Sequence, residues 1–218
     1  MLLPPHKPVA VHAWPQGMQA AVDELRGSRA MAVISVATPA TGERSLARAL
    51  IRTALRETVA MFLDQPAASI TLVSRPGQAI GVDSPLARLH LSVSHMPGMS
   101  VAAIGRAGAT GLDVMRVEQD AAEIFDWARV ALDYLGPSVS GTLQRTPPGQ
   151  RPADFARAWV HFEASLKCLG LALTEWTPAL AQRLAACRVM ALGLPEDCRG
   201  AIAVPACLAG ATIHARVS

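Results

Sequence analysis

Two short segments of this chain carry the residue types best suited to chemistry. Asp113 lies in residues 111–115 (GLDVM), an apolar stretch that predicts a buried strand, where an unpartnered carboxylate is rare. Glu163 and Lys167 are four residues apart in a segment typical of a helix, so both side chains project from one face. Carboxylate oxygens beside an ammonium group suit a divalent metal and a phosphorylated ligand. The two segments together therefore predict a metal and phosphate site.

Other polar side chains could complete such a site. Ser94 and His95 end an alternating strand that leads into a Gly-containing turn, and their hydroxyl and imidazole groups could bind phosphate oxygens. Arginine recurs at every fourth position of a predicted helix over residues 43–63, which makes one basic stripe along it: Arg44, Arg48, Arg52 and Arg56. Such a stripe is by default the solvated face of an amphipathic helix. We expect one of these arginines to contact a ligand.

Each of these residues also has a simpler interpretation. Asp113 could be a buried acid paired with an arginine, and Glu163 with Lys167 could be an exposed ion pair, which is the commonest meaning of that spacing. The apolar neighbours Trp159 and Phe162 favour partial burial of the pair. His95 could only cap a turn.

The elements that must position these residues follow from hydrophobic periodicity and turn signals. Strands are predicted over residues 9–14, 31–37, 69–74, 89–95, 99–104, 110–117, 202–204 and 211–217, and helices over residues 16–25, 43–63, 121–135, 154–173 and 178–186. The strands at 89–95, 99–104 and 110–117, joined by short turns, predict an antiparallel meander. Residues 136–152, rich in Gly, Pro, Ser and Thr, predict a mobile loop. Strands and helices mix without a regular βαβ period, which indicates the α+β class.

The composition excludes several classes of protein. The 218 residues are 51% hydrophobic and 17% charged, which is typical of a globular protein rather than a disordered one. The net charge of +3, without a basic run, argues against nucleic-acid binding. No apolar run is long enough to cross a bilayer and no secretory signal begins the chain, so we expect a cytoplasmic protein without a membrane partner. The four cysteines lack CxxC spacing and predict buried free thiols: Cys168, Cys187, Cys198 and Cys207.

Three of these segments resemble, in order, the signatures of the Sfp-type 4'-phosphopantetheinyl transferases. They are residues 91–95 (LSVSH), residues 111–114 (GLDV) and residues 159–167 (WVHFEASLK), the last followed by Gly170 and Leu171. The resemblance covers roughly residues 69–173 and, more loosely, the helix around 44–52. It implies an α+β pseudo-dimer of two similar halves, residues 1–107 and 108–218, with coenzyme A in the cleft between them.

The resemblance also implies an activity. Such enzymes transfer the phosphopantetheine arm of coenzyme A to a serine of an acyl or peptidyl carrier protein, in fatty acid, polyketide or nonribosomal peptide biosynthesis, and release 3',5'-ADP. We expect a monomer that uses Mg²⁺, with Mn²⁺ as a possible substitute. By residue match, Asp113 and Glu163 would be the metal ligands, and Glu163 would also be the catalytic base. Lys167 would contact the pyrophosphate and take part in catalysis. Ser94 and His95 would contact the phosphates of coenzyme A. Arg44 or Arg48 would contact its 3'-phosphate.

The chain departs from the family pattern at three positions. Met115 stands where a Glu is common, Phe162 where a Lys usually precedes the helix Glu, and Gln78 where a basic residue often lies. A thioether is a poor ligand for Mg²⁺, and the other two changes remove cations near a polyanion. These departures favour an alternative, a non-catalytic coenzyme A- or carrier-protein-binding protein of the same fold. A small metal-dependent hydrolase of a phosphorylated substrate is a third possibility.

Overall fold

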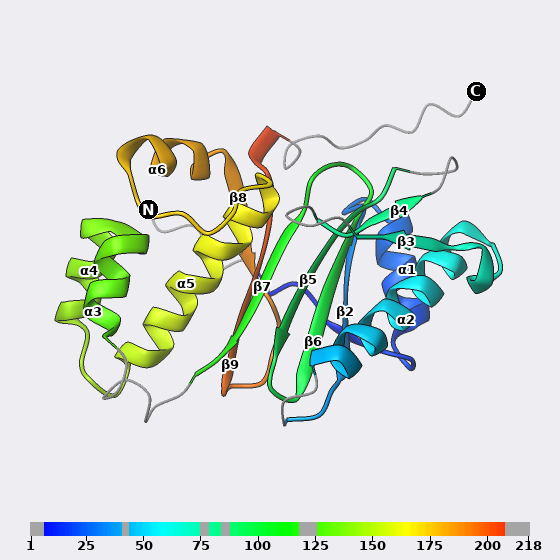
Figure 1. The fold of residues 1–218 in the computed structure, drawn as a ribbon, viewed down its shortest axis with the longest axis horizontal. Helices are drawn as coiled ribbons and strands as arrows, with labels where there is room; N and C mark the ends of the chain where they lie inside the picture. The colour runs from blue at the N-terminus through cyan, green and yellow to red at the C-terminus, as the bar shows by residue number, and fades with distance from the viewer. Residues whose placement is uncertain (1–6, 41–43, 75–78, 84–87, 118–125, 208–218) are drawn as a thin grey trace.

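The computed structural model describes residues 7–40, 44–74, 79–83, 88–117 and 126–207 of the chain. It is an α+β fold with two separate sheets between layers of helices (Figure 1). The α+β class expected from the sequence is confirmed.

The first sheet has six strands. In sheet order they are β1 (His12–Ala13), β2 (Met31–Ala37), β6 (Met99–Gly105), β5 (His90–Met96), β4 (Gly81–Asp83) and β3 (Thr71–Val73). Only the β1–β2 pair is parallel. Strand β4 pairs with β5 at a single position, Gly81 opposite His90, so the rest of that edge of β5 has no strand partner within the described residues.

Two helices cover one face of this sheet, α1 (Met18–Arg26) and α2 (Arg44–Leu63). Alternate residues of β2, such as Ile34, point toward Leu25 of α1 and Leu55 of α2 in one hydrophobic cluster. The long apolar face of α2, with its β-branched and Leu side chains at helical spacing, explains why this segment folds as one uninterrupted helix. The other residues of β2, such as Val33, face the second sheet.

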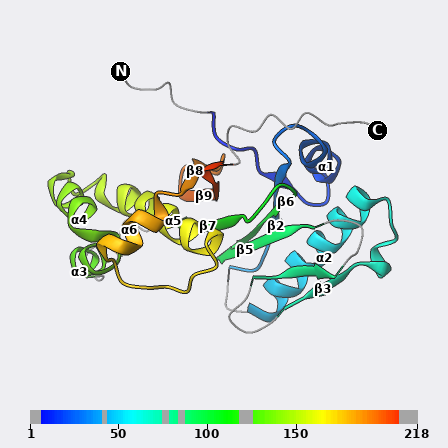
Figure 2. The same cartoon turned by 90° about the horizontal axis from the view of Figure 1, so that it is seen from above.

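The second sheet has three antiparallel strands in the order β7 (Gly111–Arg116), β9 (Cys198–Pro205) and β8 (Cys187–Ala191). Leu112 and Val114 of β7 pack toward the first sheet. The opposite face of this sheet packs against α5 (Arg151–Cys168) through Val160, Ala164 and Cys168. The remaining helices lie beyond α5, at the end of the molecule away from α1 and α2 (Figure 2): α3 (Trp127–Val130), α4 (Gly136–Arg145) and α6 (Pro178–Leu184).

The two sheets contain the same antiparallel arrangement of three strands and a long helix. In the first, β2 is followed along the chain by α2, then by β3 and β4 and then by the β5–β6 hairpin, with β6 between β2 and β5. In the second, β7 is followed by the shorter helices α3 and α4, then by α5 and α6 and then by β8 and β9, with β9 between β7 and β8. In both cases the strand that comes last in the chain lies in the middle.

Most predicted elements are confirmed within a few residues. Strands β2, β5 and β6 and helices α1, α2, α5 and α6 lie where periodicity predicts them. Strand β1 is much shorter than predicted, although Val9 forms an isolated bridge to Leu192 beside the second sheet. Strands β4 and β8 were not predicted, and residues 211–217 lie outside the described residues. Of the predicted helix over residues 121–135, residues 121–125 also lie outside them, and the remainder is confirmed as helical, in α3 and a π-helical turn at Ala131–Leu135.

The predicted meander is wrong in its last strand. Strands β5 and β6 form the expected hairpin, but β7 pairs with β9 in the other sheet. The short turn between β6 and β7 is compatible with either pairing, and the three-stranded sheet buries both faces of β7, one against the first sheet and one against α5.

The predicted loop over residues 136–152 is also wrong, because its first ten residues form α4. Gly136 has a φ of +83° and lies under the indole of Trp176, where an added Cβ would come within 2.5 Å of Nε1. Pro137 then occupies the first turn of the helix, where its missing N–H costs nothing. Leu143 anchors α4 in the hydrophobic cluster around Phe162. The Gly-Pro pair therefore marks the beginning of a helix.

A search of the helices among the described residues finds none with the length and apolarity required to cross a membrane.

Candidate functional site

Asp113 is a buried carboxylate with two hydrogen-bond donors on one oxygen. It lies in β7 and is 6% exposed. Its Oδ1 accepts a hydrogen bond from Ser94 Oγ at 2.8 Å and another from Lys167 Nζ at 2.7 Å. The structure therefore brings three predicted site residues together, although they come from β5, β7 and α5.

Glu163 lies one helical turn before Lys167 on α5. Its Oε2 is 3.7 Å from Lys167 Nζ, so one ammonium group contacts both carboxylates. Burial raises the pKa of Glu163, and the negative charge of Asp113 raises it further, while Lys167 opposes both effects. The pair is half-buried, as its apolar neighbours suggest, and is not a free surface ion pair.

The close approach of α5 to β7 depends on Gly111. A Cβ at this position would lie 2.9 Å from Cys168 Cα and closer still to the Ala164 carbonyl oxygen and the Cys168 amide nitrogen. These are backbone atoms of the helix, so they cannot rotate away as a flexible side chain would. Glycine at position 111 thus lets the last turns of α5 lie directly on the strand, which carries Lys167 to Asp113.

Two serines of β5 hold β7 on the other side. Ser92 Oγ accepts a hydrogen bond from the Leu112 amide at 2.9 Å, and Ser94 Oγ accepts one from the Val114 amide at 3.3 Å. Both serines are buried, whereas their alternation with apolar residues predicts an exposed face. Their hydroxyls satisfy backbone donors of β7 and align Ser94 with Asp113.

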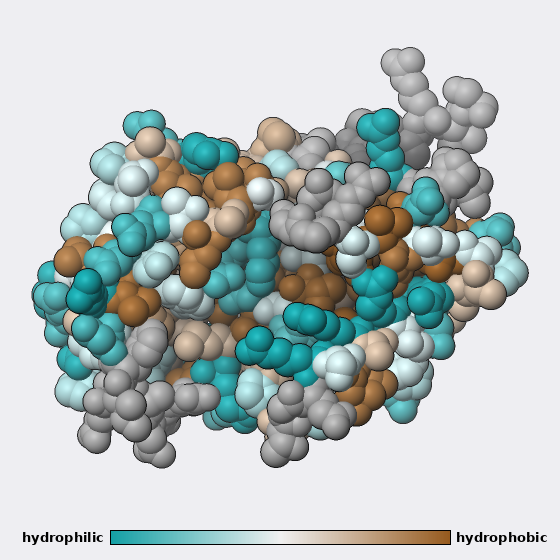
Figure 3. Space-filling view, in the orientation of Figure 1, coloured by the Kyte–Doolittle hydropathy of each residue, from teal (hydrophilic) through white to brown (hydrophobic). Residues whose placement is uncertain are grey.

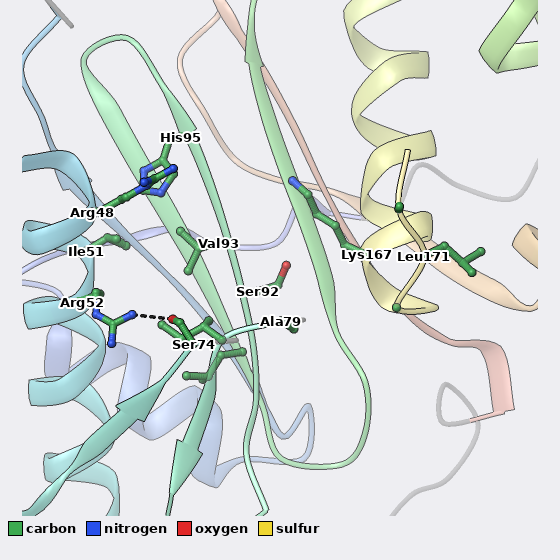
Figure 4. Close-up of a pocket in the computed structure, with 14 residues that line it drawn as sticks. Arg48, Ile51, Arg52, Ser74, Ala79, Ser92, Val93, His95, Lys167 and Leu171 are labelled. Atoms are coloured by element: carbon green, nitrogen blue, oxygen red, sulfur yellow. Dashed lines mark hydrogen bonds between the residues drawn. The ribbon is translucent and has the colours of Figure 1, made fainter. Parts of the chain in front are cut away.

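A cavity of about 630 Å³ lies beside these residues, at the edge of β5 that has no strand partner. That volume is in the range of small-molecule sites. Its floor is apolar and includes Ile51, Leu91 and Val93. Figure 4 shows Arg48 and Arg52 entering from α2 on one side and Lys167 from α5 on the other. Figure 3 shows hydrophobic surface in the middle of the face drawn in Figure 1, bordered by strongly hydrophilic residues.

His95 faces the same cavity as an exposed residue of β5. Its Nδ1 is 2.7 Å from Ser100 Oγ. Partial burial lowers the pKa of His95, and the positive charges of Arg48, Lys167 and Arg44 lower it further. Several cations therefore share a small region, and a polyanionic ligand would relieve their mutual repulsion.

The structure distinguishes the two arginines expected to bind a phosphate. Arg48 lines the cavity, but Arg44 does not, although its charge acts on His95. Arg52 is a lining residue that was not selected from the sequence. Its guanidinium donates to Ser74 Oγ at 2.7 Å and to the Leu72 carbonyl at 2.8 Å, which fixes it at the end of β3. Its position four residues after Arg48, on the same side of the helix, is the sequence pattern that could have identified Arg52 as a lining residue.

The departures from the family pattern have different structural consequences. Met115 is part of the hydrophobic contacts between β7, β9 and α5. Phe162 is buried in the cluster between α4, α5 and α6, where it lines a second cavity of about 540 Å³. It therefore lies away from the cationic cavity. Gln78 is outside the described residues.

Asp113 and Glu163 can supply part of the ligand set of a Mg²⁺ ion. Among the described residues, no group of three or more His, Cys, Asp and Glu side chains is arranged to hold a metal. Asp113 and Glu163 are nevertheless two carboxylates on one cation, the Lys167 ammonium, and Mg²⁺ is usually held by one or two carboxylates together with substrate phosphates and water. The chemistry of these ligands is thus compatible with a metal that is completed by a phosphorylated ligand.

The cysteines are free, as predicted, but not all are buried. Cys168 and Cys198 are buried, Cys187 is partly buried and Cys207 is exposed. Burial raises the pKa of Cys168 to about 12, with a further contribution from Cys187. These thiols take no part in the site.

No protein-family model matches the chain, and a search of curated proteins finds no significant match. Support for a function therefore comes from the residues, their geometry and the resemblance of the three segments.

Proposed function

We propose that this protein is a Mg²⁺-dependent 4'-phosphopantetheinyl transferase that acts on an acyl or peptidyl carrier protein. The observation that carries the proposal is the convergence of Ser94, Asp113, Glu163 and Lys167, from three separate elements, at the edge of a cationic cavity. These residues belong to the three segments that resemble the family's signatures.

The repeated strand–helix–hairpin arrangement supports the pseudo-dimer that the resemblance implies. The proposed boundary between residues 107 and 108 falls between β6 and β7, where the chain leaves the first sheet for the second. The cavity is lined from both proposed halves, by α2 and β5 on one side and by the end of α5 on the other. A cleft between the halves is the place where the family binds coenzyme A.

The cations of the cavity suit the phosphates of coenzyme A. We infer that Lys167 contacts the pyrophosphate, since it lies beside the carboxylates, and that Arg48, His95 and Arg52 lie toward the 3'-phosphate. Arg52 is preorganised by its hydrogen bonds to β3, so its guanidinium loses little further freedom on binding. The apolar floor would contact the uncharged parts of the ligand.

In the proposed reaction, the serine oxygen of the carrier protein attacks the phosphorus that bears the pantetheine arm. A new P–O bond forms, and the bond to the bridging oxygen breaks, so that 3',5'-ADP leaves with the bonding electron pair. Glu163 accepts the serine proton as the general base. Lys167 stabilises charge on the pyrophosphate. Mg²⁺, held by Asp113 and Glu163, would supply further charge neutralisation there.

Mass spectrometry tests the proposal. Apo acyl and peptidyl carrier proteins incubated with the protein, coenzyme A and Mg²⁺ should gain one phosphopantetheine group, and 3',5'-ADP should appear only when a carrier protein is present. Glu163→Gln should abolish transfer while the protein still folds and binds coenzyme A. Equal rates for wild type and Glu163→Gln would contradict the role of this carboxylate. Release of 3',5'-ADP without a carrier protein would instead indicate a hydrolase.

One observation favours the non-catalytic alternative. Met115 packs in the hydrophobic contacts of the second sheet, so position 115 supplies no carboxylate beside Asp113. A protein that only binds coenzyme A would be thermally stabilised by it without modifying any carrier protein. That result would establish the alternative.

A further inference from the structure

Lys167 occupies a central position between the two acidic side chains. Its Nζ lies 2.7 Å from Asp113 Oδ1 and 3.7 Å from Glu163 Oε2. Among the described residues, no other cationic side chain forms an ion pair with either carboxylate. The ammonium thus provides the positive charge that the buried Asp113 and the half-buried Glu163 require.

One oxygen of the Asp113 carboxylate is already engaged. Asp113 Oδ1 accepts hydrogen bonds from both Ser94 and Lys167. A divalent cation bound between Asp113 and Glu163 would meet the ammonium at close range, and like charges at such a distance repel strongly where solvent is partly excluded. Metal and ammonium are therefore competitors for the same place.

The Lys167 ammonium can also reach the cationic cavity. It lies in the last turn of α5, its side chain is 31% exposed, and it lines the cationic cavity as well as contacting the carboxylates. Figure 4 shows its side chain projecting from α5 toward the neighbouring strands at the edge of this cavity. A rotation about its flexible side-chain bonds would carry the ammonium from the carboxylates to an anion in the cavity.

We propose that Lys167 is an exchangeable counter-cation, which holds Asp113 and Glu163 together in the ligand-free protein and moves to a ligand phosphate when a divalent metal takes its place. This inference rests on the metal site of the proposed function. It makes binding of the metal alone weak, and it couples metal binding to the arrival of a phosphorylated ligand. The site is thereby kept closed to free divalent cations until the ligand is present.

Metal affinity in the absence of coenzyme A tests the exchange. Mn²⁺ binding, followed by the electron paramagnetic resonance of the free ion, should be weak in the wild type and at least about fivefold tighter in Lys167→Met, the lower end of typical coupling between sites. Lys167→Gln, whose amide can still donate to Asp113 but carries no charge, should bind Mn²⁺ more tightly as well. Lys167→Arg keeps the charge and should remain weak.

A matched control removes a different cation of α5. Arg157 pairs with Asp154 at 2.8 Å and does not contact the carboxylates, so Arg157→Met should leave Mn²⁺ affinity unchanged. Lys167→Met should also melt at a lower temperature than wild type in a chelator and regain stability with Mn²⁺. This second readout needs no enzymatic activity.

The outcomes separate this inference from the proposed function. Tighter Mn²⁺ binding by both neutral variants supports the exchange even if the wild type modifies no carrier protein. Equal or weaker Mn²⁺ binding by the neutral variants overturns the exchange even if the wild type is an active transferase.

Discussion

The contact between α5 and β7 at Gly111 gives the most direct prediction about this protein. In Gly111→Ala, the new methyl group would lie 2.9 Å from Cys168 Cα and nearer to two other backbone atoms of the helix. Carbon atoms pack at about 3.5 Å, so the helix and strand must separate by roughly 1 Å. Overpacking usually costs about 1–3 kcal/mol. Because the obstacle here is backbone, we expect a loss of about 3 kcal/mol, the upper end of that range.

The same separation should disable the site. Lys167 Nζ lies 2.7 Å from Asp113 Oδ1, and a further separation of roughly 1 Å would break this hydrogen bond. A misplacement of that size at an active site can lower a rate by about 100-fold. We therefore expect Gly111→Ala to lose most of the proposed transferase activity even at temperatures where it remains folded.

Thermal unfolding measures the cost, and Gly200→Ala is its matched control. Gly200 lies in β9 opposite Val114, and the nearest atoms to a Cβ there would be side-chain methyl groups of Leu194, Leu192 and Val114 rather than backbone atoms. For a chain of this size, about 3 kcal/mol corresponds to a decrease in Tm of about 6–12 °C, and Gly200→Ala should lose clearly less. If both variants melt within a degree or two of wild type, the reasoning about the helix–strand contact is wrong.

Three further predictions concern other parts of the molecule. Ser94→Ala should lower the free energy of unfolding by about 1–3 kcal/mol, because Asp113 loses a donor and the Val114 amide loses its acceptor; an unchanged urea midpoint would count against it. Arg52→Gln should weaken coenzyme A binding roughly tenfold by calorimetry, whereas Arg56→Gln, on the same helix but outside the cavity lining, should bind normally; equal affinities would refute a ligand role for Arg52. Iodoacetamide should label exposed Cys207 in the native protein and leave Cys168 intact up to about pH 9, since burial raises the pKa of Cys168 to about 12. Peptide mass mapping identifies the labelled cysteine, and labelling of Cys168 below that pH would contradict the prediction.

Local patterns predicted the elements whose burial is set by their own periodicity. Strand β2 is apolar along almost its whole length because both of its faces are covered, by α1 and α2 on one side and by the second sheet on the other. Helix α2 has the spacing of a single long amphipathic helix. In such cases the sequence within the element contains the information that decides its structure.

The remaining features depend on partners distant in the chain. The alternation of Ser92 and Ser94 with apolar residues is that of a strand with one solvated face, but here the serine hydroxyls bind the amides of β7. The hydrogen bonds that these hydroxyls accept from the amides take the place of the solvent that the alternating pattern implies. Likewise, the Glu163–Lys167 spacing predicts a shared helical face, but the ion pair of Lys167 with Asp113 joins residues 54 positions apart. No local spacing identifies that contact.

The two long helices explain how a chain with a small net charge can present a strongly charged site. Helix α2 packs on the first sheet and helix α5 packs on the second. Helix α2 brings Arg48 and Arg52 to the cavity, while α5 brings Glu163 and Lys167. One helix thus supplies fixed positive charge for an anion, and the other supplies an acid–ammonium pair that can rearrange. Substitution of Arg52 on α2 should therefore change ligand affinity, whereas substitution of Glu163 on α5 should change the rate of the proposed transfer.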